Sequence, residues 1–444
     1  MKNTHSLQVQ SHYSFLPVGQ GTFSIGSLEV QGRHNSIFRW VYDCGAVKGR
    51  QNQLVGEIDR QAWVTHVSPL SARPTIDLVF ISHFDNDHVS GLVELLSRFD
   101  VTTLVLPFIP LWKRLALAVS VQCANYPRLQ EFLFDPIGFI GRIEAVKIQR
   151  IYLVPPSDKN MSGSDDEADP PLDSPIDDAL DLRPSRVVDF PEGVGRVDVT
   201  LERLEELPFK VSELVSGGRL LLGNFWEFVP YNDPTLKTYA TPIFRAAVSR
   251  VSSALLKSSI HKRQRILSRL KSIYDRTFGA TAKQRNLISL FLYSGPVGIY
   301  AASDCRYSVF KPAIKINKIN WLCRCYCGQC YFCGIQISHN EKVGILYTGD
   351  GYLDTASSFN YLSNYLGRRR FDQLRVLQVM HHGSRKNWHK GLAVKFSPVV
   401  SIFCADPKYT YRHPHAQVLS DFASYGPVIV DGNSGYTCFQ CIDW

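Results

Sequence analysis

The sequence predicts an α/β fold, because strand-like and helix-like segments alternate in both halves of the chain. Paired strand-like segments open the sequence, and apolar strands separated by helical spacing follow them. Strand–helix alternation then returns from residue 286 to the end. Hairpins followed by such alternation are typical of layered cores that combine sheets and helices. With 444 residues, of which 45% are hydrophobic and 20% charged, the chain is long enough to bury one large domain or two ordinary ones.

The first half contains six predicted strands and one clear helical pattern. The strands are expected at residues 14–18, 22–27, 37–42, 76–82, 103–107 and 148–154. The turn Gly19-Gln20-Gly21 joins the first two, and the third ends at Asp43-Cys44-Gly45. The fourth is continuously apolar, as strands buried on both faces are. Leu92, Leu95 and Leu96 lie on one side of the helix expected after it.

Further strands are predicted in the second half of the chain. They are expected at residues 286–293, 342–348, 374–380, 399–404 and 428–430. Residues 1–154 and 286–444 are therefore expected to form the two halves of a single core.

Two segments of different composition separate the halves of this core. Residues 155–185 contain nine acidic residues and one lysine, so an acidic, disordered insert is expected there. Residues 186–285 form a second expected insert, which contains a basic helical region. Between residues 245 and 285, eleven Lys or Arg residues accompany a single acidic residue. This charge pattern fits either a solvated helix face or a clamp for phosphates.

The sequence contains no predicted membrane span and no secretion signal. The longest apolar stretch, residues 290–302, is interrupted by Ser294, Gly295 and Pro296. The first residues, MKNTHSLQVQ, lack the apolar core of a signal peptide, so we expect a cytoplasmic protein without a membrane partner. The net charge of +9 favours a polyanionic partner.

Eleven cysteines in such a chain indicate thiols or metal sites rather than a disulfide framework. Five of them lie in the stretch WLCRCYCGQCYFC, residues 321–333. Cys327, Cys330 and Cys333 have the spacing of zinc knuckles or iron–sulfur runs, so a structural zinc is expected in a Cys-rich hairpin. The alternative is a hairpin in which the cysteines pack as small hydrophobic residues.

Three predicted strands end in residues that can bind metal ions. These are His83, Asp85, Asp87 and His88 after the strand at 76–82, Asp350 after the strand at 342–348, and His381 and His382 after the strand at 374–380. The carboxyl ends of strands in open α/β sheets carry ligand sites. A mixture of imidazole and carboxylate favours zinc, manganese or iron over calcium. The alternative is a helix N-cap at Asn86 or Asp87, which accounts for one aspartate and leaves the rest without a role.

These motifs, in this order, resemble the metallo-β-lactamase superfamily. Its usual HxHxDH motif stands here as HxDxDH at residues 83–88. With YTGD at 347–350 and HHGS at 381–384, this variant is similar to the metallo-hydrolase domain of ComEC-type competence proteins. The likeness extends over most of the chain outside the inserts. It includes VGQG at 18–21, DCG at 43–45, NLISLFL from residue 286 and HPHAQVL at 413–419.

The resemblance implies a four-layer αββα sandwich with inserts and a site for two divalent metal ions, zinc or manganese. The implied metal ligands are His83 and Asp85 for one ion, Asp87 and His88 for the other, Asp350 as the bridge, and His382. The implied catalytic residues are Asp87, His381 and His415, and the implied substrate-binding residues are Asn286, Ser384 and His413. For His413 and His415 the alternative is a surface turn fixed by Pro414. A further metal-binding histidine, usual in the superfamily, has no counterpart here.

The expected function is that of a metal-dependent hydrolase, a phosphodiesterase or nuclease that attacks nucleic acid with a hydroxide activated by two metals. The basic segment, the run Arg368-Arg369-Arg370 and the pair Arg385-Lys386 account for a polyanionic substrate. Two alternatives stay open. One is a hydrolase of small esters, lactams or phosphodiesters, and the other is a nucleic-acid-binding module with a degenerate site.

Overall fold

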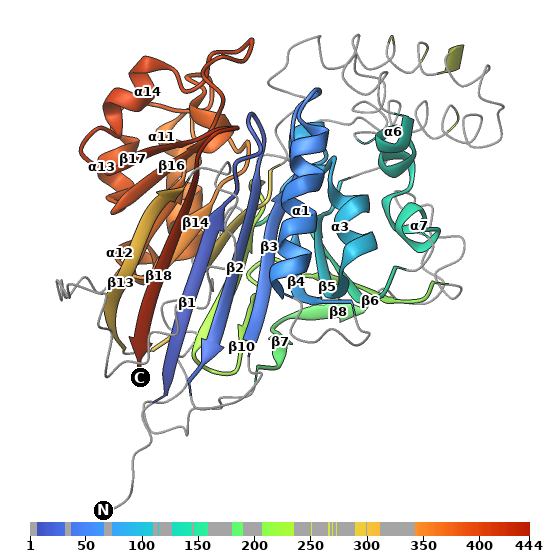
Figure 1. The fold of residues 1–444 in the computed structure, drawn as a ribbon, viewed down its shortest axis with the longest axis horizontal. Coiled ribbons are helices and arrows are strands. Elements are labelled where there is room, and N and C mark those ends of the chain that lie inside the picture. The colour runs from blue at the N-terminus through green and yellow to red at the C-terminus, as the bar shows by residue number, and fades with distance from the viewer. Residues whose placement is uncertain are drawn as a thin grey trace, which may run out of the picture.

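The computed structural model has a mixed α/β fold with two large mixed sheets and few helices, which confirms the predicted fold class (Figure 1). It describes residues 7–31, 37–65, 73–109, 114, 127–143, 146–158, 180–189, 207–234, 250, 265–266, 269, 272, 289–298, 300–310 and 342–444. No helix within these ranges is long and apolar enough to cross a membrane.

The first sheet has ten strands in the order β13-β18-β1-β2-β3-β4-β5-β6-β9-β8. Their bounds are β1 (Gln8–Phe15), β2 (Phe23–Val30), β3 (Ile37–Cys44), β4 (Thr75–Phe80), β5 (Asp100–Pro107), β6 (Ile148–Val154), β8 (Val187–Asp189), β9 (Lys210–Leu214), β13 (Ala301–Phe310) and β18 (Gly435–Asp443). The strands β3 to β6 and β9 pair in parallel, whereas β13, β18, β1 and β2 pair antiparallel. Because β18 pairs with β1, the first and last strands of the chain lie side by side (Figure 1).

The second sheet has eight strands in the order β17-β16-β15-β14-β12-β11-β10-β7. Their bounds are β7 (Leu182–Pro184), β10 (Leu220–Leu222), β11 (Trp226–Tyr231), β12 (Phe291–Pro296), β14 (Gly344–Tyr347), β15 (Leu374–Gln378), β16 (Val400–Cys404) and β17 (Pro427–Val430). The strands β14 to β17 pair in parallel. The carboxyl ends of β14 and β15, where metal ligands are predicted, therefore meet at one edge of this sheet.

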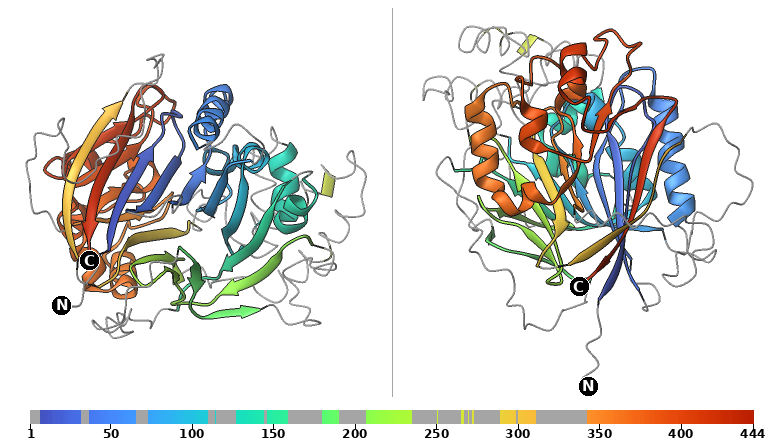
Figure 2. Two further views of the ribbon diagram at one scale, coloured as in Figure 1. Left: turned by 60° about the horizontal axis from the view of Figure 1, so that its bottom comes forward. Right: turned by 90° about the vertical axis from the view of Figure 1, so that its left-hand side faces the viewer.

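Helices lie along both sheets (Figures 1 and 2). Beside the first sheet are α1 (Gln51–Thr65), α3 (Leu92–Arg98), α6 (Pro127–Phe134) and α7 (Pro136–Gly141). Beside the second are α11 (Ala356–Leu366), α12 (Arg368–Asp372), α13 (Leu392–Phe396) and α14 (Ala416–Asp421). Two short helical segments, α2 (Asn86–Val89) and the 3-10 helix η3 (Met380–Gly383), follow β4 and β15 and carry predicted metal ligands.

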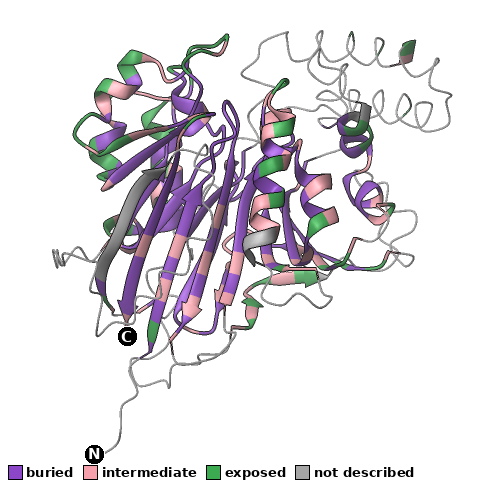
Figure 3. Cartoon of the chain, viewed as in Figure 1, coloured by how far each residue is buried: buried purple, intermediate pink, exposed green. Residues whose placement is uncertain are grey.

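Three hydrophobic clusters hold these elements together. One packs α1, α3, α6 and α7 against the first sheet, one lies between the two sheets, and one packs α11, α13 and α14 against the second. In β4, Leu78 and Phe80 belong to the cluster between the sheets, and Val79 belongs to the cluster under the helices. Both faces of this part of the strand are covered, which is why the residues Leu78, Val79 and Phe80 are all apolar. Figure 3 shows this burial along the central strands.

Parts of the predicted inserts at 155–185 and 186–285 form strands of the two sheets. Strand β7 comes from the first of these segments, strands β8 to β11 come from the second, and all five extend the two sheets. Strand β11 is buried at every residue and pairs with β12, so this part of the segment belongs to the second sheet. These strands were not predicted because the composition averaged over a whole segment does not reveal short strands between charged flanks. Strands β13 and β18 also lie where no strand is predicted, and the strand predicted at 286–293 lies at Phe291–Pro296.

Several predicted features lie outside the described residues. They are most of the acidic insert, most of the basic helical region, Asn286, and the Cys-rich hairpin 321–333 with Cys327, Cys330 and Cys333. Within the basic region, the described residues Arg250, Arg265, Ile266, Arg269 and Ser272 have helical backbone. The structural zinc stays a prediction.

Glu227 on β11 forms a buried charged cluster with three arginines. Its carboxylate accepts from Arg370 at 2.8 and 2.9 Å, from Arg369 at 2.8 Å and from Arg219 at 2.9 Å. Burial by itself raises the pKa of Glu227, but the three guanidinium groups outweigh it and lower the pKa. Arg369 and Arg370 thus join α12 to β11 through Glu227.

We predict that Glu227→Gln destabilises the fold, because it leaves three guanidinium groups without their carboxylate. Breaking a buried ion pair on one side typically costs about 3–5 kcal/mol, so the free energy of unfolding in urea should fall by about that amount. Arg368→Gln is the control in the same arginine run, since its side chain is 89% exposed and pairs with Asp372 at 3.3 Å. It should change the stability by less than about 1 kcal/mol, and equal effects of the two variants would contradict the role of Glu227.

The Glu227 cluster should also make the stability depend on pH. Because the folded pKa lies below the ordinary value of 4.5, the contribution of the carboxylate is complete above about pH 4.5 and is lost as the pH falls through the folded pKa. Below pH 4.5 the wild type should therefore lose stability more steeply than Glu227→Gln. Urea unfolding of both proteins across this range measures the difference, and parallel curves would speak against it.

Candidate metal centre

The HxDxDH motif occupies the loop after β4 and the start of α2. Asp85 is the N-cap residue of α2, but its side chain makes no capping hydrogen bond. The side chain of Asn86 instead donates to the carbonyl oxygen of Ala46 at 3.0 Å. The alternative of an N-cap at Asn86 or Asp87 is therefore wrong, and capping does not explain the acidic residues.

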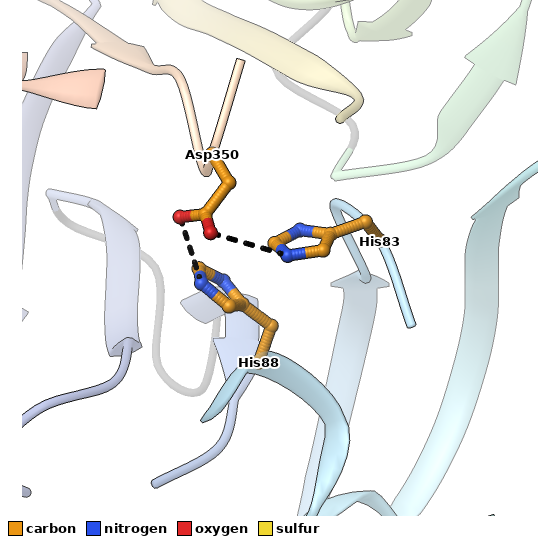
Figure 4. A group of neighbouring side chains, drawn as sticks. All are labelled: His83, His88 and Asp350. Carbon is orange, nitrogen blue, oxygen red and sulfur yellow. Dashed lines mark ion pairs between the residues drawn. The ribbon is translucent and has the colours of Figure 1, made fainter. Parts of the chain in front are cut away.

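His83, His88 and Asp350 come together where β4 and β14 end (Figure 4). Both imidazoles point toward the Asp350 carboxylate: Nε2 of His83 lies 3.6 Å from Oδ2, and Nε2 of His88 lies 3.1 Å from Oδ1. Asp85 joins this group from the side, with its Oδ2 4.0 Å from Nε2 of His83. The backbone N–H of Asp350 donates to Oγ of Ser289 at 2.9 Å, which holds the aspartate in place.

A second group consists of Asp87, His88 and His382, and its ligand atoms lie within 4.8 Å of one another. Nε2 of His382 lies 3.2 Å from Oδ2 of Asp87 and 3.5 Å from Oδ1 of Asp350. His88 belongs to both groups, and Asp350 contacts histidines of both. The structure thus brings the six predicted metal ligands to one place.

His381 and His382 have left-handed backbone conformations, with φ of 47° and 57°. Residues other than glycine rarely adopt this region, and they persist there only where the surrounding structure fixes them. The N–H of His381 donates to the carbonyl oxygen of Gly349 at 2.8 Å, which ties the histidine turn to the segment that carries Asp350. As a result, Nε2 of His381 also lies near Asp350, 3.5 Å from Oδ2.

Asp43 fixes the orientation of both histidines of the first motif. His88 donates from Nδ1 to Oδ2 of Asp43 at 2.7 Å. The hydroxyl of Ser82 donates to the same oxygen at 2.7 Å, so in its other contact, at 2.9 Å from Nδ1 of His83, it must accept from the imidazole. Both histidines therefore use Nδ1 as a donor and turn Nε2 toward the cluster, as metal-binding histidines do.

Four buried atoms of the cluster make no hydrogen bond: Nε2 of His83, His88 and His382, and Oδ1 of Asp350. His382 resembles the other two histidines, because its Nδ1 donates to the carbonyl oxygen of Cys404 at 2.5 Å. A buried polar atom without a partner costs about 1–3 kcal/mol. Divalent cations would satisfy all four atoms, and three imidazole nitrogens with carboxylates fit zinc or manganese.

Asp43 stands in the sequence as part of the DCG motif and has no predicted role in the site, although it supports the whole site. It is fully buried, has a left-handed φ of 56°, and also accepts from the backbone N–H of Ser82 at 2.6 Å. The available signal is the apolar strand that ends in Asp-Cys-Gly. The glycine of this motif, Gly45, is needed for close approach, because a Cβ there would lie 2.3 Å from the backbone nitrogen of His88.

The charges of the site favour bound cations. Burial by itself lowers the pKa of His88, but Asp350 and Asp43 outweigh it and raise the pKa well above its ordinary value. The pKa of His382 is raised in the same way, against the effect of burial, by Asp350 and Asp87. Carboxylates that hold protons on neighbouring imidazoles also attract metal ions, which replace those protons on binding.

Further predicted site residues lie around the cluster. The ring centroid of His413 lies 5.8 Å from that of His381 and 6.2 Å from that of His382. The ring of His415 lies 4.9 Å from His413, and its Nδ1 accepts from the backbone N–H of Arg385 at 3.3 Å. His413 is only 5% exposed, which does not fit a surface turn.

The other two predicted substrate-binding residues have different outcomes. Ser384 follows the histidine turn, is buried, and accepts through Oγ from the backbone N–H of Lys386 at 3.3 Å. Asn286 lies outside the described residues. The structure therefore brings His413 and Ser384 to the neighbourhood of the cluster.

Comparison with known proteins does not identify a family for this chain. A scan against protein-family models finds no match for the chain, and a search of curated proteins finds no significant relative. Evidence for a function comes from the cluster itself.

We predict that Asp43→Asn weakens metal binding without unfolding the protein. Asparagine keeps the shape of the side chain but loses the charge that holds His88 and Ser82. Loss of such a supporting contact typically lowers metal affinity by about 10–100-fold, which competition with a chromophoric chelator measures. Asp59→Asn, at an exposed carboxylate on α1 paired with Arg98, is the control and should leave the affinity unchanged. Wild-type affinity in Asp43→Asn would contradict the orienting role.

Proposed function

We propose that this protein is a metal-dependent hydrolase that acts as a phosphodiesterase or nuclease on nucleic acid. One observation carries the proposal: three imidazole Nε2 atoms and Oδ1 of the Asp350 carboxylate, all buried, converge on one small region without hydrogen bonds. Polar atoms buried in this way are costly unless a ligand satisfies them. Such a donor set supports a site for two divalent cations, zinc or manganese.

The finer fold that we propose is the four-layer αββα sandwich of the metallo-β-lactamase superfamily. The hydrophobic clusters support it, because helices pack on each sheet and a further cluster lies between the sheets. The motifs that resemble ComEC-type metallo-hydrolase domains support it too. HxDxDH, TGD, HHGS and HPH come from separate parts of the sequence and meet around the cluster.

In this proposal His83 and Asp85 would hold one cation, Asp87, His88 and His382 would hold the other, and Asp350 would contribute to both sites. The short separations between His83 and Asp350 and between Asp87 and His382, 3.6 and 3.2 Å, support this division. When bound, the two cations supply an activated water and offset the charge that develops at the attacked phosphorus.

In this proposal the side chains around the cluster orient the attacking water, contact the substrate and protonate the leaving group. Burial by itself raises the pKa of Asp87, but the neighbouring imidazoles of His382 and His88 outweigh it and lower the pKa, so Asp87 stays ionised and orients the attacking water. The side chain of His381 is 22% exposed beside Asp350 and contacts the substrate. His415 donates a proton to the leaving oxygen, and His413 and Ser384 position the substrate.

A polyanionic substrate is supported by basic residues close to the cluster and elsewhere in the chain. Arg385 and Lys386 are exposed and directly follow the histidine turn. The segment 245–285 carries eleven basic residues and one acidic residue, and the whole chain has a net charge of +9. Contacts between such side chains and phosphates provide most of the non-specific affinity for nucleic acid.

We further propose a cytoplasmic location. Cys44, Cys404, Cys438 and Cys441 are buried free thiols. Such thiols persist in a reducing compartment.

The decisive test of the proposed function is Asp350→Asn. The amide has the shape of the carboxylate but lacks the charge that a bridge between two cations requires, so at least one metal ion should be lost. Cleavage of an oligonucleotide with zinc, manganese or magnesium should then fall by orders of magnitude. Circular dichroism should be unchanged, because no cavity is created, and Asp372→Asn at a 66% exposed carboxylate should behave as the wild type. A folded Asp350→Asn protein with near-normal cleavage would refute the two-metal mechanism.

The same assay separates the alternatives. A small-molecule hydrolase would cleave bis(p-nitrophenyl) phosphate or an ester and leave oligonucleotides intact. A binding module with a degenerate site would bind an oligonucleotide equally well as wild type and as Asp87→Ala, and neither protein would cleave it.

A further inference from the structure

Tyr411 is an exposed aromatic residue close to the metal cluster. It is 56% exposed, and the other exposed large hydrophobic residues in the described part of the chain are Val188 and Val394. A single exposed hydrophobic residue has no special meaning by itself. Tyr411 differs from the two valines in what lies beneath its ring.

The ring of Tyr411 stacks on His413, and His413 stacks on His382. The first pair has centroids 5.8 Å apart and an interplanar angle of 23°, and the second has values of 6.2 Å and 18°. His382 belongs to the metal cluster, so this column of rings begins at the cluster and ends in solvent. Tyr411 thus packs on His413 and is still more than half exposed, so part of its ring surface is open to a ligand.

The loop that carries Tyr411 is fixed at both ends. At its start, the carboxylate of Asp406 pairs with Arg50 at 2.9 Å. At its end, the N–H of His415 donates to the carbonyl oxygen of Gly383 at 3.0 Å, next to the histidine turn. An aromatic ring that is already held in place binds a flat ligand at a lower cost in conformational entropy.

A second tyrosine extends this aromatic surface. Tyr409 lies edge-on to Tyr411, with centroids 5.8 Å apart and an interplanar angle of 62°. The two tyrosines thus form one aromatic surface beside the candidate site.

Basic side chains accompany the aromatic surface. Lys408 and Arg412 flank the two tyrosines in the sequence and are exposed. Arg385 and Lys386, which follow the histidine turn, are exposed as well. Asp406, the acidic residue of the loop, is paired with an arginine, so its charge is offset. Aromatic faces among cationic side chains are typical of surfaces that bind single-stranded nucleic acid.

We propose that Tyr411 is a stacking platform for an unpaired nucleobase, and that the substrate of this site is single-stranded nucleic acid. The inference rests on the proposed phosphodiesterase function and names its substrate class. An unpaired base lies on the open face of Tyr411 while the basic side chains hold the neighbouring phosphates. In a duplex the faces of the bases are covered by their neighbours, so a duplex gains only the phosphate contacts.

The test is the binding of three end-labelled oligonucleotides, measured by fluorescence anisotropy in EDTA and in calcium. They are a short single strand, the same strand with abasic nucleotides, and the same strand annealed to its complement. Tyr411→Ala should weaken binding of the single strand by about 5- to 100-fold and leave the abasic strand and the duplex within about twofold. Tyr411→Leu, which has bulk without an aromatic face, should behave as Tyr411→Ala does, and Tyr411→Phe should behave as the wild type.

Two control variants distinguish the loss of base stacking from the loss of a positive charge and from a change at any exposed side chain. Arg412→Gln should weaken binding of all three oligonucleotides alike, because each of them contains phosphates. Val394→Ala removes a side chain of similar exposure, 64%, on α13 and should change none of them.

Different results would refute the stacking platform and the proposed hydrolase function. The inference is overturned if the wild type binds the single strand and the abasic strand equally, or if Tyr411→Ala and Tyr411→Leu keep the wild-type preference. A wild-type protein that prefers the single strand but cleaves nothing would refute the hydrolase and leave the stacking platform standing. If the wild type cleaves single strands and the Tyr411 variants bind them as tightly as the wild type does, the hydrolase stands and the stacking platform is refuted.

Discussion

The hydrogen bond between His88 and Asp43 is the interaction on which the candidate metal centre depends. Both residues are fully buried, and the bond of 2.7 Å sets the direction of the His88 ring. Through Ser82, the same carboxylate orients His83. The end of β3 and the loop after β4 are thereby locked to each other. Without these hydrogen bonds, the Nε2 atoms of His83 and His88 would not be held pointing at the same site. The metal-ligand residues would then be present but would not form a metal-binding site.

The centre also depends on how the two sheets pack, because its ligands come from both. Directional contacts in the core set their relative position. Nε1 of Trp40 on β3 donates to the hydroxyl of Tyr347 on β14 at 3.2 Å, and the hydroxyl of Tyr42 donates to the carbonyl oxygen of Leu290 at 2.8 Å. The rings of Tyr42 and Tyr347 also stack, with centroids 4.5 Å apart. Apolar packing tolerates small slides of one sheet over the other, whereas these polar contacts favour one position.

Local patterns were sufficient for much of the fold. Strand β6 is observed at the predicted residues 148–154, because a run of apolar residues such as the one that fills its second half, residues 151–154, is a property of neighbouring residues. The strands taken from the predicted inserts were missed for the converse reason. Strand β11 has Glu227 in its interior, which reads as polar surface in the sequence, and its partner Arg370 is 143 residues away. Only the tertiary structure supplies the guanidinium groups that make this carboxylate a core residue.

For the candidate site, the sequence by itself determined the residue types, since histidines and aspartates at strand ends are a local signal. It also determined their order along the chain, on which the resemblance to a family rests. The tertiary structure decided which of them meet, and which residues orient them. Asp43 and His88 are separated by 45 positions, and the column from His382 through His413 to Tyr411 joins two different loops. Such relations depend on distances between parts of the chain that only folding brings together, so no local pattern contains them.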